Sequence, residues 1–404
     1  MNKHRADLHV VVTGGGIAGS TTALALRKAG IAATVVDPGS DGARGASVRL
    51  NPNALDALRA LDLHEEVAAA SFPVSVSETL SSSGRRIGRL ATRSGSRLAV
   101  PRAMAWSRLA ELLGERAEQA GAEFRRGRVR EIERTGDGVR AALDDGTTTT
   151  GTALVGADGP GSTVRGILNP RGPGPQHCRA TTIRGFTPEP TFTTPPDEVV
   201  RIHLGARGVF VLLREPSSGG CFWTASVPTA RPMTAQERRP QHWRDRLPEL
   251  FAGDAAPVAD AVSGAVAGTD RIVALDDLAL PHLPRWRDDR LVLVGDAAHV
   301  TSPAAEQGAG MALEDGAVLA RCLRDAPSTA EALGAYERLR RERAETVVAL
   351  GAKTLRREHE RGANQYLRRA AHRLQSWLPG SIPAAGPKWA LDHHIAWDEP
   401  AVGS

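Results

Sequence analysis

The amino-acid sequence predicts an α/β protein in which a discontinuous domain with a parallel sheet carries an inserted domain with an antiparallel sheet, followed by C-terminal helices. Three observations lead to this prediction. A glycine-rich strand–helix–strand pattern occupies residues 10–37, segments of alternating hydrophobicity lie within residues 171–277, and a buried-strand pattern returns at residues 290–299. Apolar runs that alternate with helices favour a parallel sheet, whereas period-two alternation favours an antiparallel one.

The first of these patterns reads VVVTGGGIAGSTTALALRKAGIAATVVD. In it, Gly14 permits the tight turn that leaves the strand, Gly16 lets the backbone approach a pyrophosphate, and Gly19 allows the helix to pack closely on the strand. The phosphates are expected at the positive end of the helix, beside the amides of Ile17 and Ala18. The pattern therefore indicates a Rossmann-like dinucleotide-binding unit.

Asp37 stands at the end of the second strand of this unit. A carboxylate in this position accepts hydrogen bonds from ribose hydroxyl groups and disfavours a 2′-phosphate. The bound dinucleotide is therefore expected to be FAD or NAD.

Composition and charge exclude several classes of protein. No apolar run approaches the ~18 residues that a membrane span needs, and the N-terminal segment lacks the apolar core of a signal peptide, so we expect a cytoplasmic protein with no membrane partner. The three cysteines, Cys178, Cys221 and Cys322, lack CxxC spacing, which argues against a disulfide framework and a metal site. The formal net charge is +5, but the arginines of residues 336–348 are mixed with glutamates, as on a solvated helix face, so no nucleic acid partner is expected.

The length of the chain suits two closely joined domains. A strand and hairpin pattern at residues 125–150, just ahead of the apolar run at residues 152–156, is expected to extend the parallel sheet. Asn53 is expected to cap a helix. The expected divisions are residues 1–170 for the first part of the dinucleotide-binding domain, with small strands near 75–105 contributing to the substrate side, residues 171–277 for a substrate-binding β-sheet domain, residues 278–325 for the second part of the first domain, and residues 326–404 for a C-terminal helical region.

Three separate segments carry a resemblance to one family. They are GGGIAG at residues 14–19, GADGPGSTVR at residues 156–165 and GDAAHVTSPAAEQGAGMALED at residues 295–315. In this order they resemble the FAD-dependent aromatic hydroxylases, single-component flavoprotein monooxygenases with the para-hydroxybenzoate hydroxylase fold. The resemblance spans most of the chain and implies a discontinuous Rossmann-like FAD-binding domain with an inserted antiparallel-sheet substrate domain and C-terminal helices.

The resemblance also implies roles for particular residues. Asp158 in the second segment would lie beside the pyrophosphate of FAD, and Asp296 in the third would bind the ribityl chain. The helix that begins near Gly308, Ala309 and Gly310 would direct its N-terminal amides at the N1/O2 side of the flavin ring. The positive potential of a helix end there stabilises an anionic reduced flavin.

The chain departs from the family pattern at two cofactor contacts. Pro38 follows the ribose carboxylate where the family usually has an arginine, and Arg44 is a candidate to supply that adenosine contact instead. Trp106 stands where many members have an arginine, so Arg108 or Arg102 is expected to reach the FAD phosphates, because an arginine fork suits phosphate.

The resemblance implies an NAD(P)H-consuming monooxygenase. NAD(P)H would bind transiently and reduce FAD, and one oxygen atom of O2 would pass through a flavin C4a-hydroperoxide into an aromatic, indole or polyketide-type small molecule by hydroxylation or epoxidation. Such chemistry belongs to secondary metabolism, including antibiotic biosynthesis, or to the degradation of aromatic compounds. A monomer or homodimer is expected.

Three residues are candidates for catalysis. Pro303 resembles the family's front-loop proline, next to the substrate. Glu306 stands where glycine is common and is either an acid or base near the flavin or a loop carboxylate turned to solvent. His203 is either a pocket residue or a histidine on the sheet surface. Period-two alternation shows which residues share a face of the strand, but not which face is exposed to solvent. Tyr336 and Tyr366 both lie in the C-terminal region, which excludes a tyrosine base on the substrate sheet.

Other interpretations of the motifs remain open at this point. A flavin-dependent halogenase is disfavoured because the string GCFWTASVP lacks the spacing of the halogenase motif. A prenyl-reductase-like flavoprotein would reduce its substrate without O2. A non-catalytic flavin-binding protein is also possible, since a fold does not guarantee a function. Within that string, Phe222 and Trp223 line either the pocket or the core of the sheet.

Overall fold

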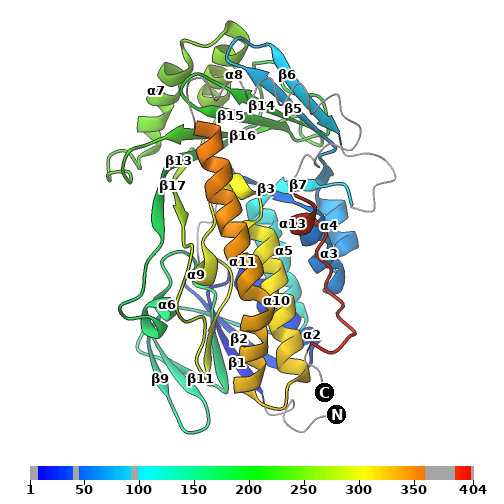
Figure 1. Ribbon diagram of the computed structural model, residues 1–404, viewed down its shortest axis with the longest axis vertical. Helices are drawn as coiled ribbons and strands as arrows, with labels where there is room; N and C mark the ends of the chain where they lie inside the picture. Colours follow the sequence, from blue (N-terminus) through cyan, green and yellow to red (C-terminus); the bar gives the residue numbers. More distant parts are fainter. Residues whose placement is uncertain (1–7, 40–44, 92–98, 360–386, 402–404) are drawn as a thin grey trace.

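The computed structural model describes residues 8–39, 45–91, 99–359 and 387–401. A parallel sheet and a larger mixed sheet lie at opposite ends of the molecule, and the helices α10 (Gly308–Asp325) and α11 (Thr329–His359) run between them (Figure 1). The α/β fold class predicted from the sequence is confirmed.

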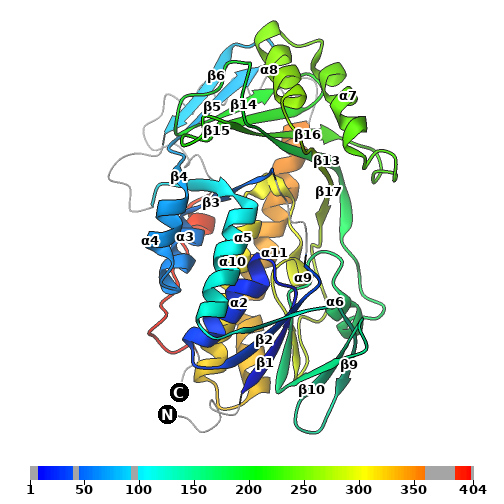
Figure 2. The same ribbon diagram turned by 180° about the vertical axis from the view of Figure 1, so that it is seen from behind.

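The parallel sheet holds the glycine-rich unit. Its central strands are fully buried, as expected for apolar strands covered on both faces. Beside it, helix α2 (Ile17–Lys28) packs against both α5 (Trp106–Gln119) and α10 (Figure 2). The five strands, all in parallel pairs, follow the order β18 (Leu291–Leu293), β12 (Ala153–Gly156), β1 (His9–Thr13), β2 (Ala32–Asp37) and β8 (Glu123–Arg126).

The expected extension of this sheet by a hairpin is wrong. The strands β9 (Val129–Arg134), β10 (Val139–Leu143) and β11 (Thr148–Gly151) form a separate three-stranded antiparallel sheet. Only the flanking strands β8 and β12 join the parallel sheet. Alternating hydrophobicity identifies a strand, but it does not choose that strand's neighbour.

The large sheet has seven strands and is mixed rather than wholly antiparallel, which corrects a second expectation. Its strand β14 pairs in parallel with β5, a strand from the first part of the chain. That contribution comes from the region near residues 75–105 where small strands were expected. The order is β17 (Val273–Ala279), β13 (Gln176–Thr187), β16 (Cys221–Pro228), β15 (Val209–Arg214), β14 (Val199–Leu204), β5 (Val76–Ser81) and β6 (Arg86–Ala91).

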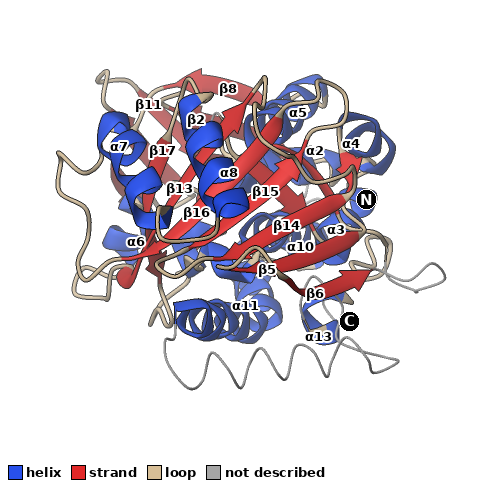
Figure 3. Ribbon diagram, turned by 90° about the horizontal axis from the view of Figure 1, so that it is seen from above, coloured by secondary structure: helices blue, strands red, loops and turns tan. Residues whose placement is uncertain are grey.

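The two faces of the large sheet have different neighbours. Helices α7 (Pro240–Phe251) and α8 (Ala256–Ala267) lie across the outer face (Figure 3), where Phe210 and Trp223 pack against them. On the inner face, Leu213 and Phe222 pack against Phe72. The inner face therefore turns toward the rest of the molecule.

A small antiparallel sheet connects the two large ones. Its strands, in order, are β3 (Ser47–Leu50), β7 (Arg102–Ala105) and β4 (Phe72–Pro73). Helices α3 (Pro52–Ala60) and α4 (His64–Ala70) lie between β3 and β4 in the chain. Shorter helices complete the described fold: α6 (Thr163–Leu168), α9 (Asp296–His299), the 3-10 turn η1 (Pro303–Ala305) and α13 (Lys388–Leu391). Within the described ranges, no helix has the length and apolar character needed to cross a membrane.

A buried ion cluster joins α10 to α11 and to the loop after β18. Arg340 on α11 donates to Glu314 at 2.5 Å and to Asp315 at 2.8 Å, and all three side chains are inaccessible to solvent. Asp315 also accepts from the backbone N–H of Gly295 at 2.8 Å and lies 2.6 Å from Nε2 of His299. Burial alone would raise the pKa of Asp315, but His299 and Arg340 hold it well below its usual range. The cluster fixes α10 in position relative to the segment that begins at residue 295.

We predict that Arg340→Ala lowers the free energy of unfolding by about 3–5 kcal/mol, because it leaves two buried carboxylates without their cation. Urea unfolding of the purified variant measures this change. Arg338→Ala is the matched control, since Arg338 lies on the exposed side of the same helix; its effect is expected within about 0.5 kcal/mol. Equal losses in the two variants would contradict the assigned role of the cluster.

Candidate active site

The glycine loop between β1 and α2 leaves open space where a phosphate could lie. Gly14 has a φ of +94°, and a Cβ atom on it would lie 2.5 Å from the carbonyl oxygen of Ala157. A Cβ on Gly19 would lie 1.7 Å from the carbonyl oxygen of Gly14, whereas one on Gly16 would meet nothing within 4 Å. The turn and the close helix packing expected of Gly14 and Gly19 are therefore confirmed. No side chain caps the first-turn amides of α2, so these donors are free for an anion.

The carboxylate of Asp37 contacts this loop through Gly15. It accepts hydrogen bonds from the backbone N–H groups of Gly15 and Gly39, each at 2.9 Å. These contacts leave further acceptor capacity on both oxygens. Its role toward a ribose stays a prediction, and Arg44, the expected adenosine contact, lies outside the described residues.

The second motif, residues 156–165, stabilises its own local structure. Asp158 lies against Gly14 and accepts from Ser162 Oγ and from the backbone N–H of Thr163 at 2.7 Å, so it caps α6. The buried Arg165 side chain donates to the carbonyl oxygens of Asp296 and Ala297. This arginine therefore ties the second motif to the third, a link that the sequence pattern does not reveal.

The carboxylate of Asp296 lies open to solvent in an otherwise buried segment. Gly295 and Ala297 on either side are buried, while Asp296 itself is exposed. Burial among its neighbours nevertheless raises the pKa of Asp296, against the positive charges of His299 and Arg165. In the described part of the chain its side chain accepts no hydrogen bond. A carboxylate without a partner can accept hydrogen bonds from the hydroxyl groups of a polyhydroxylated chain.

The N-terminus of α10 is surrounded by polar groups whose hydrogen-bonding capacity is unused. Gly308, Ala309 and Gly310 form its first turn, and the N-cap residue Gln307 provides no side-chain cap. Buried atoms without a partner there are Arg49 Nε, Asn51 Oδ1, Asn53 Oδ1, Thr301 Oγ1 and Gln307 Nε2. Buried polar atoms in proteins are normally paired, so this group fits a site that a polar ligand completes.

Asn53 does not cap a helix as expected. It lies in the first turn of α3, where its Nδ2 donates to Gln307 Oε1 at 2.9 Å and to Glu314 Oε1 at 2.7 Å. It thereby fixes α3 to the start of α10. Sequence reasoning did not find Arg49, Asn51 or Gln307 either; the only signal was the polar residues in and just after the strand at residues 47–50, and Gln307 had none.

Glu306 has a left-handed backbone with a φ of +51°, a conformation that favours glycine. Its side chain forms an ion pair with Arg49 at 3.2 Å, and its carbonyl oxygen accepts from Asn51 Nδ2 at 2.7 Å. The side chain is 43% exposed. Pro303 begins η1, three residues before Glu306. The two predicted catalytic residues thus occupy the loop that leads into α10.

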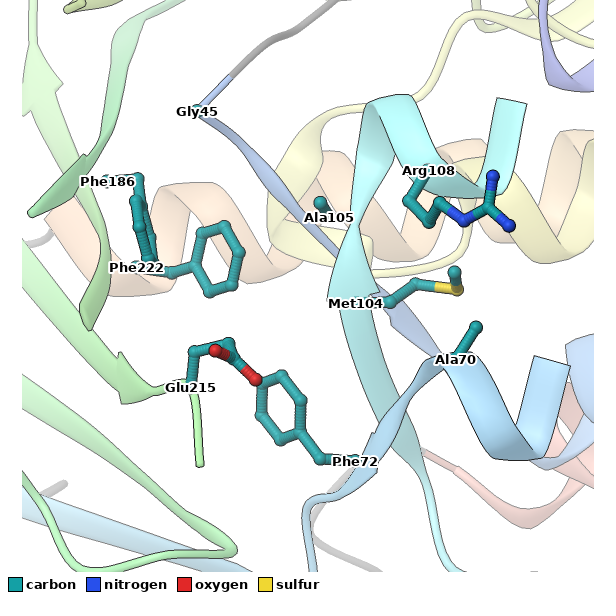
Figure 4. Close-up of a pocket in the computed structure, with 9 residues that line it drawn as sticks. All are labelled: Gly45, Ala70, Phe72, Met104, Ala105, Arg108, Phe186, Glu215 and Phe222. Carbon is teal, nitrogen blue, oxygen red and sulfur yellow. The ribbon is translucent and has the colours of Figure 1, made fainter. Parts of the chain in front are cut away.

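A pocket of about 350 Å³ lies between the small sheet and the inner face of the large sheet (Figure 4). Its apolar lining comes from five elements, α4, β4, β7, β13 and β16, and the rings of Phe186 and Phe222 are tilted against each other with centroids 4.7 Å apart. Phe222 therefore belongs to the pocket, and Trp223, on the opposite face, to the core. The lining residues are Gly45, Ala70, Phe72, Met104, Ala105, Arg108, Phe186, Glu215 and Phe222.

The two arginines proposed for the FAD phosphates have other partners here. Arg108 lines the pocket with its guanidinium turned away from the aromatic rings (Figure 4), and it forms ion pairs with Glu111 at 3.8 Å and Glu115 at 3.6 Å. Arg102 donates to the carbonyl oxygens of Ala68 and Ser71 at the end of α4, each at 2.6 Å. Contact of Arg108 with a phosphate stays a prediction.

His203 is not a pocket residue, which corrects its candidate role. It pairs across the sheet with Phe210, whose side chain packs on the outer face, and only 3% of His203 is exposed. It is therefore neither on the wet surface nor facing the pocket. Burial and the nearby Arg201 lower the pKa of His203 to about 4, so it is neutral at physiological pH.

Comparison with known proteins agrees with this geometry. Residues 7–350 match the model of the FAD binding domain family, and the chain belongs to this family. It is 30% identical over 354 residues to aurachin C monooxygenase/isomerase of Stigmatella aurantiaca, covering 85% of this chain and 88% of that protein. It is 31% identical over 361 residues to phenazine 1,6-dicarboxylic acid hydroxylase of Lysobacter antibioticus, covering 82% and 86%.

Solved structures share the fold. The structure of Klebsiella pneumoniae HpxO with FAD and uric acid has a TM-score of 0.80 at 22% identity and covers 92% of this chain and 94% of its own. A salicylate hydroxylase substrate complex has a TM-score of 0.75 at 21% identity and covers 91% and 93%. The chain is thus an FAD-dependent monooxygenase of the aromatic hydroxylase type, and the glycine loop, the free Asp296 carboxylate and the α10 terminus fit FAD.

We predict that Asp296→Ala weakens FAD binding by about 10- to 100-fold, because the variant loses an acceptor for ribityl hydroxyl groups. The visible absorbance of bound flavin, relative to protein, measures the loss after purification. Asp289→Ala removes a largely exposed carboxylate from the preceding loop and is expected to keep its flavin. Full flavin occupancy in the Asp296 variant would refute the assignment.

We also predict that substitutions at two glycines of the loop separate binding from folding. Gly16→Ala is expected to keep the apoprotein's melting temperature and to weaken FAD binding, because its Cβ points into open space. Gly19→Ala is expected to destabilise the apoprotein, because its Cβ would overlap the Gly14 carbonyl. Thermal unfolding and flavin titration distinguish the two. If Gly16→Ala binds FAD as the wild type does, no phosphate approaches that backbone.

Proposed function

We propose that this protein is an NAD(P)H-consuming monooxygenase that transfers one oxygen atom of O2 to an aromatic, indole or polyketide-type small molecule. The observation that carries the proposal is an apolar, phenylalanine-lined pocket on the inner face of the large sheet, in a chain that also has the features of an FAD site. The name of one relative, phenazine 1,6-dicarboxylic acid hydroxylase, contains an aromatic ring system, which supports the same substrate class for this chain.

The pocket suits a flat, weakly polar ring. Phe72, Phe186 and Phe222 come from different strands and offer ring faces and edges, with which an aromatic ligand packs at separations of about 4.5–7 Å. An apolar wall excludes water, and it strengthens each electrostatic interaction inside the site. Glu215 is the carboxylate at its edge, and its oxygens accept from Ser217 and Ser218.

FAD, once bound and reduced, supplies the activation of O2. The chain's own residues bind and orient it: the α2 terminus the phosphates, Asp296 the ribityl hydroxyl groups, and the α10 terminus the ring edge on which negative charge develops. Pro303 and η1 would lie in the loop beside that ring. The buried ion cluster holds α10 and this loop in a fixed relation, so the positive helix end is present before the reaction begins.

NAD(P)H is proposed as a transient reductant. Monooxygenation consumes two electrons and two protons in addition to O2, because one oxygen atom enters the product and the other leaves as water. The sequence shows a single glycine fingerprint, so we infer that the reductant reaches the flavin without a Rossmann unit of its own.

The proposal is tested with FAD-loaded protein, NADH or NADPH, and a panel of phenols, indoles and polyketide aromatics. The expected result is reductant consumption stimulated by particular compounds, with one atom of isotopically labelled O2 in the product. Substrate reduction without O2 would favour a reductase instead. A flavin-loaded protein that consumes no reductant with any member of the panel would contradict the proposed function.

We predict that Glu306→Gln retains FAD but lowers kcat by about 100-fold or more, the typical contribution of a group that transfers a proton. The substitution keeps the size of the side chain and its backbone contacts while removing the charge that pairs with Arg49. Steady-state kinetics with the best compound of the panel measure the change, and Glu342→Gln, on the exposed face of α11, is the control. Unchanged kcat would limit Glu306 to shaping the loop.

A further inference from the structure

A cleft of about 1220 Å³ lies where α10 ends and α11 begins, at the end of the molecule opposite the large sheet (Figure 1). Three segments that are far apart in the chain form it: the loop before β18, the turn between the two helices, and the C-terminal segment. Because α10 has 18 residues, the cleft lies roughly 25 Å from the N-terminus of that helix, at a rise of about 1.5 Å per residue. It is therefore separate from the candidate active site.

Two arginines meet above a glycine that lines this cleft. A Cβ atom on Gly334 would lie 3.2 Å from Nη2 of Arg287 and 3.4 Å from Nη1 of Arg338. These separations are tighter than ordinary van der Waals contact, so any larger residue would push the guanidinium groups away. Gly334 lies inside α11, where glycine is a poorer helix former than alanine. The missing side chain gives both cations room at one place.

The protein leaves both of these guanidinium groups incompletely paired. Arg338 is exposed, and it has no hydrogen-bond or ion-pair partner in the described part of the chain. Arg287 lies 3.3 Å from Glu337 through Nε and 3.9 Å from Asp289 through Nη1. Its Nη2 atom, the one near Gly334, has no partner among the described residues. Two like charges side by side repel each other, so an anion bound between them would be stabilising.

The other charged groups of the cleft already have partners. Arg324 donates to the two carboxylate oxygens of Asp325 at 2.6 and 2.8 Å and to the carbonyl oxygen of Trp397 at 2.7 Å. Glu331 accepts from Ser328 Oγ at 3.0 Å. The two unpaired cations are thus flanked by carboxylates, which would repel a long polyanion such as a nucleic acid or an acidic peptide. A small anionic ligand fits this distribution of charge.

A phosphate group suits two adjacent guanidinium groups better than a carboxylate does. One arginine fork can pair with both oxygens of a carboxylate, whereas a phosphate monoester carries nearly two negative charges and three acceptor oxygens. The cleft is also much larger than a phosphate ion, and Ala326, Pro327 and Ala330 contribute uncharged side chains to its lining. That surface has room for the organic part of a ligand.

We propose that this cleft is a binding site for a small organic phosphate, in which Arg287 and Arg338 donate hydrogen bonds to the phosphate oxygens. The organic part of the ligand lies against Ala326, Pro327 and Ala330. Gly334 keeps the space in which the two guanidinium groups meet. The inference goes beyond the proposed function, because the site uses neither the flavin nor the aromatic pocket.

The test uses FAD-loaded protein, so that the cofactor already occupies its own phosphate-binding features. Isothermal titration calorimetry in phosphate-free buffer gives the dissociation constants of three organic phosphates: AMP, glucose 6-phosphate and glycerol 3-phosphate. The corresponding compounds without phosphate, adenosine, glucose and glycerol, and inorganic phosphate are titrated in the same way.

Two variants alter the cleft, and each has a matched control. Arg338→Gln removes the unpaired cation, and its control, Arg356→Gln, removes another exposed arginine of α11. Gly334→Ala adds the Cβ that displaces the guanidinium groups. Its control, Gly114→Ala, adds a Cβ within α5 at an ordinary contact distance of 3.8 Å from Ser20 Oγ.

At least one organic phosphate is expected to bind the wild type about tenfold or more tightly than its phosphate-free counterpart and than inorganic phosphate. Arg338→Gln and Gly334→Ala are each expected to weaken that binding by about tenfold or more, and the two controls to retain it. Gly334→Ala is also expected to keep or raise the melting temperature, because alanine favours a helix. Its loss of affinity would then not reflect unfolding.

Three outcomes overturn the inference. The wild type binds none of the organic phosphates, or Arg338→Gln or Gly334→Ala keeps the wild-type affinity, or inorganic phosphate binds as tightly as every organic phosphate, which would indicate an adventitious ion only. Because the titrations contain no reductant, they separate this site from the proposed function. An active monooxygenase that binds no organic phosphate would refute only the site, and an inactive protein that binds one through Arg338 would refute only the monooxygenase.

Discussion

The ion cluster buried beneath α10 is the interaction on which the site depends. Two adjacent carboxylates, Glu314 and Asp315, would be strongly unfavourable in an apolar core without Arg340 and His299. Because Arg340 and His299 pair with these carboxylates, the cluster links the middle of α10, the long helix α11 and the loop at Gly295. The positive end of α10 and the free carboxylate of Asp296 therefore have fixed positions relative to each other. Reactive groups that are held in place need no reorganisation when charge develops.

Local sequence was sufficient for those features that depend on neighbouring residues. The turn at Gly14 and the packing at Gly19 follow from a few consecutive residues, and the structure has both. The discontinuous sheet was predictable because apolar strands such as residues 291–293 retain their pattern wherever they occur in the chain. The family assignment followed from three motifs of this local kind.

Features that depend on distant contacts were not predictable. Alternation placed His203 and Ile202 on opposite faces of a strand, but which face meets helices and which meets the pocket depends on elements far along the chain. The contact of Asn53 with α10 joins residues separated by more than 250 positions, and nothing near Asn53 indicates it.

The parallel pairing of β14 with β5 has a consequence for how this chain reaches its native state. Contacts in that pair, such as Arg201 with Glu78, join residues 123 positions apart. The large sheet therefore cannot be completed by the inserted segment alone, and a fragment that begins at residue 171 would leave a strand edge unpaired. High sequence separation of contacts slows folding, and unpaired edges promote association with other chains. The large sheet can therefore be completed only after both β5 and β14 have been synthesised and have come together.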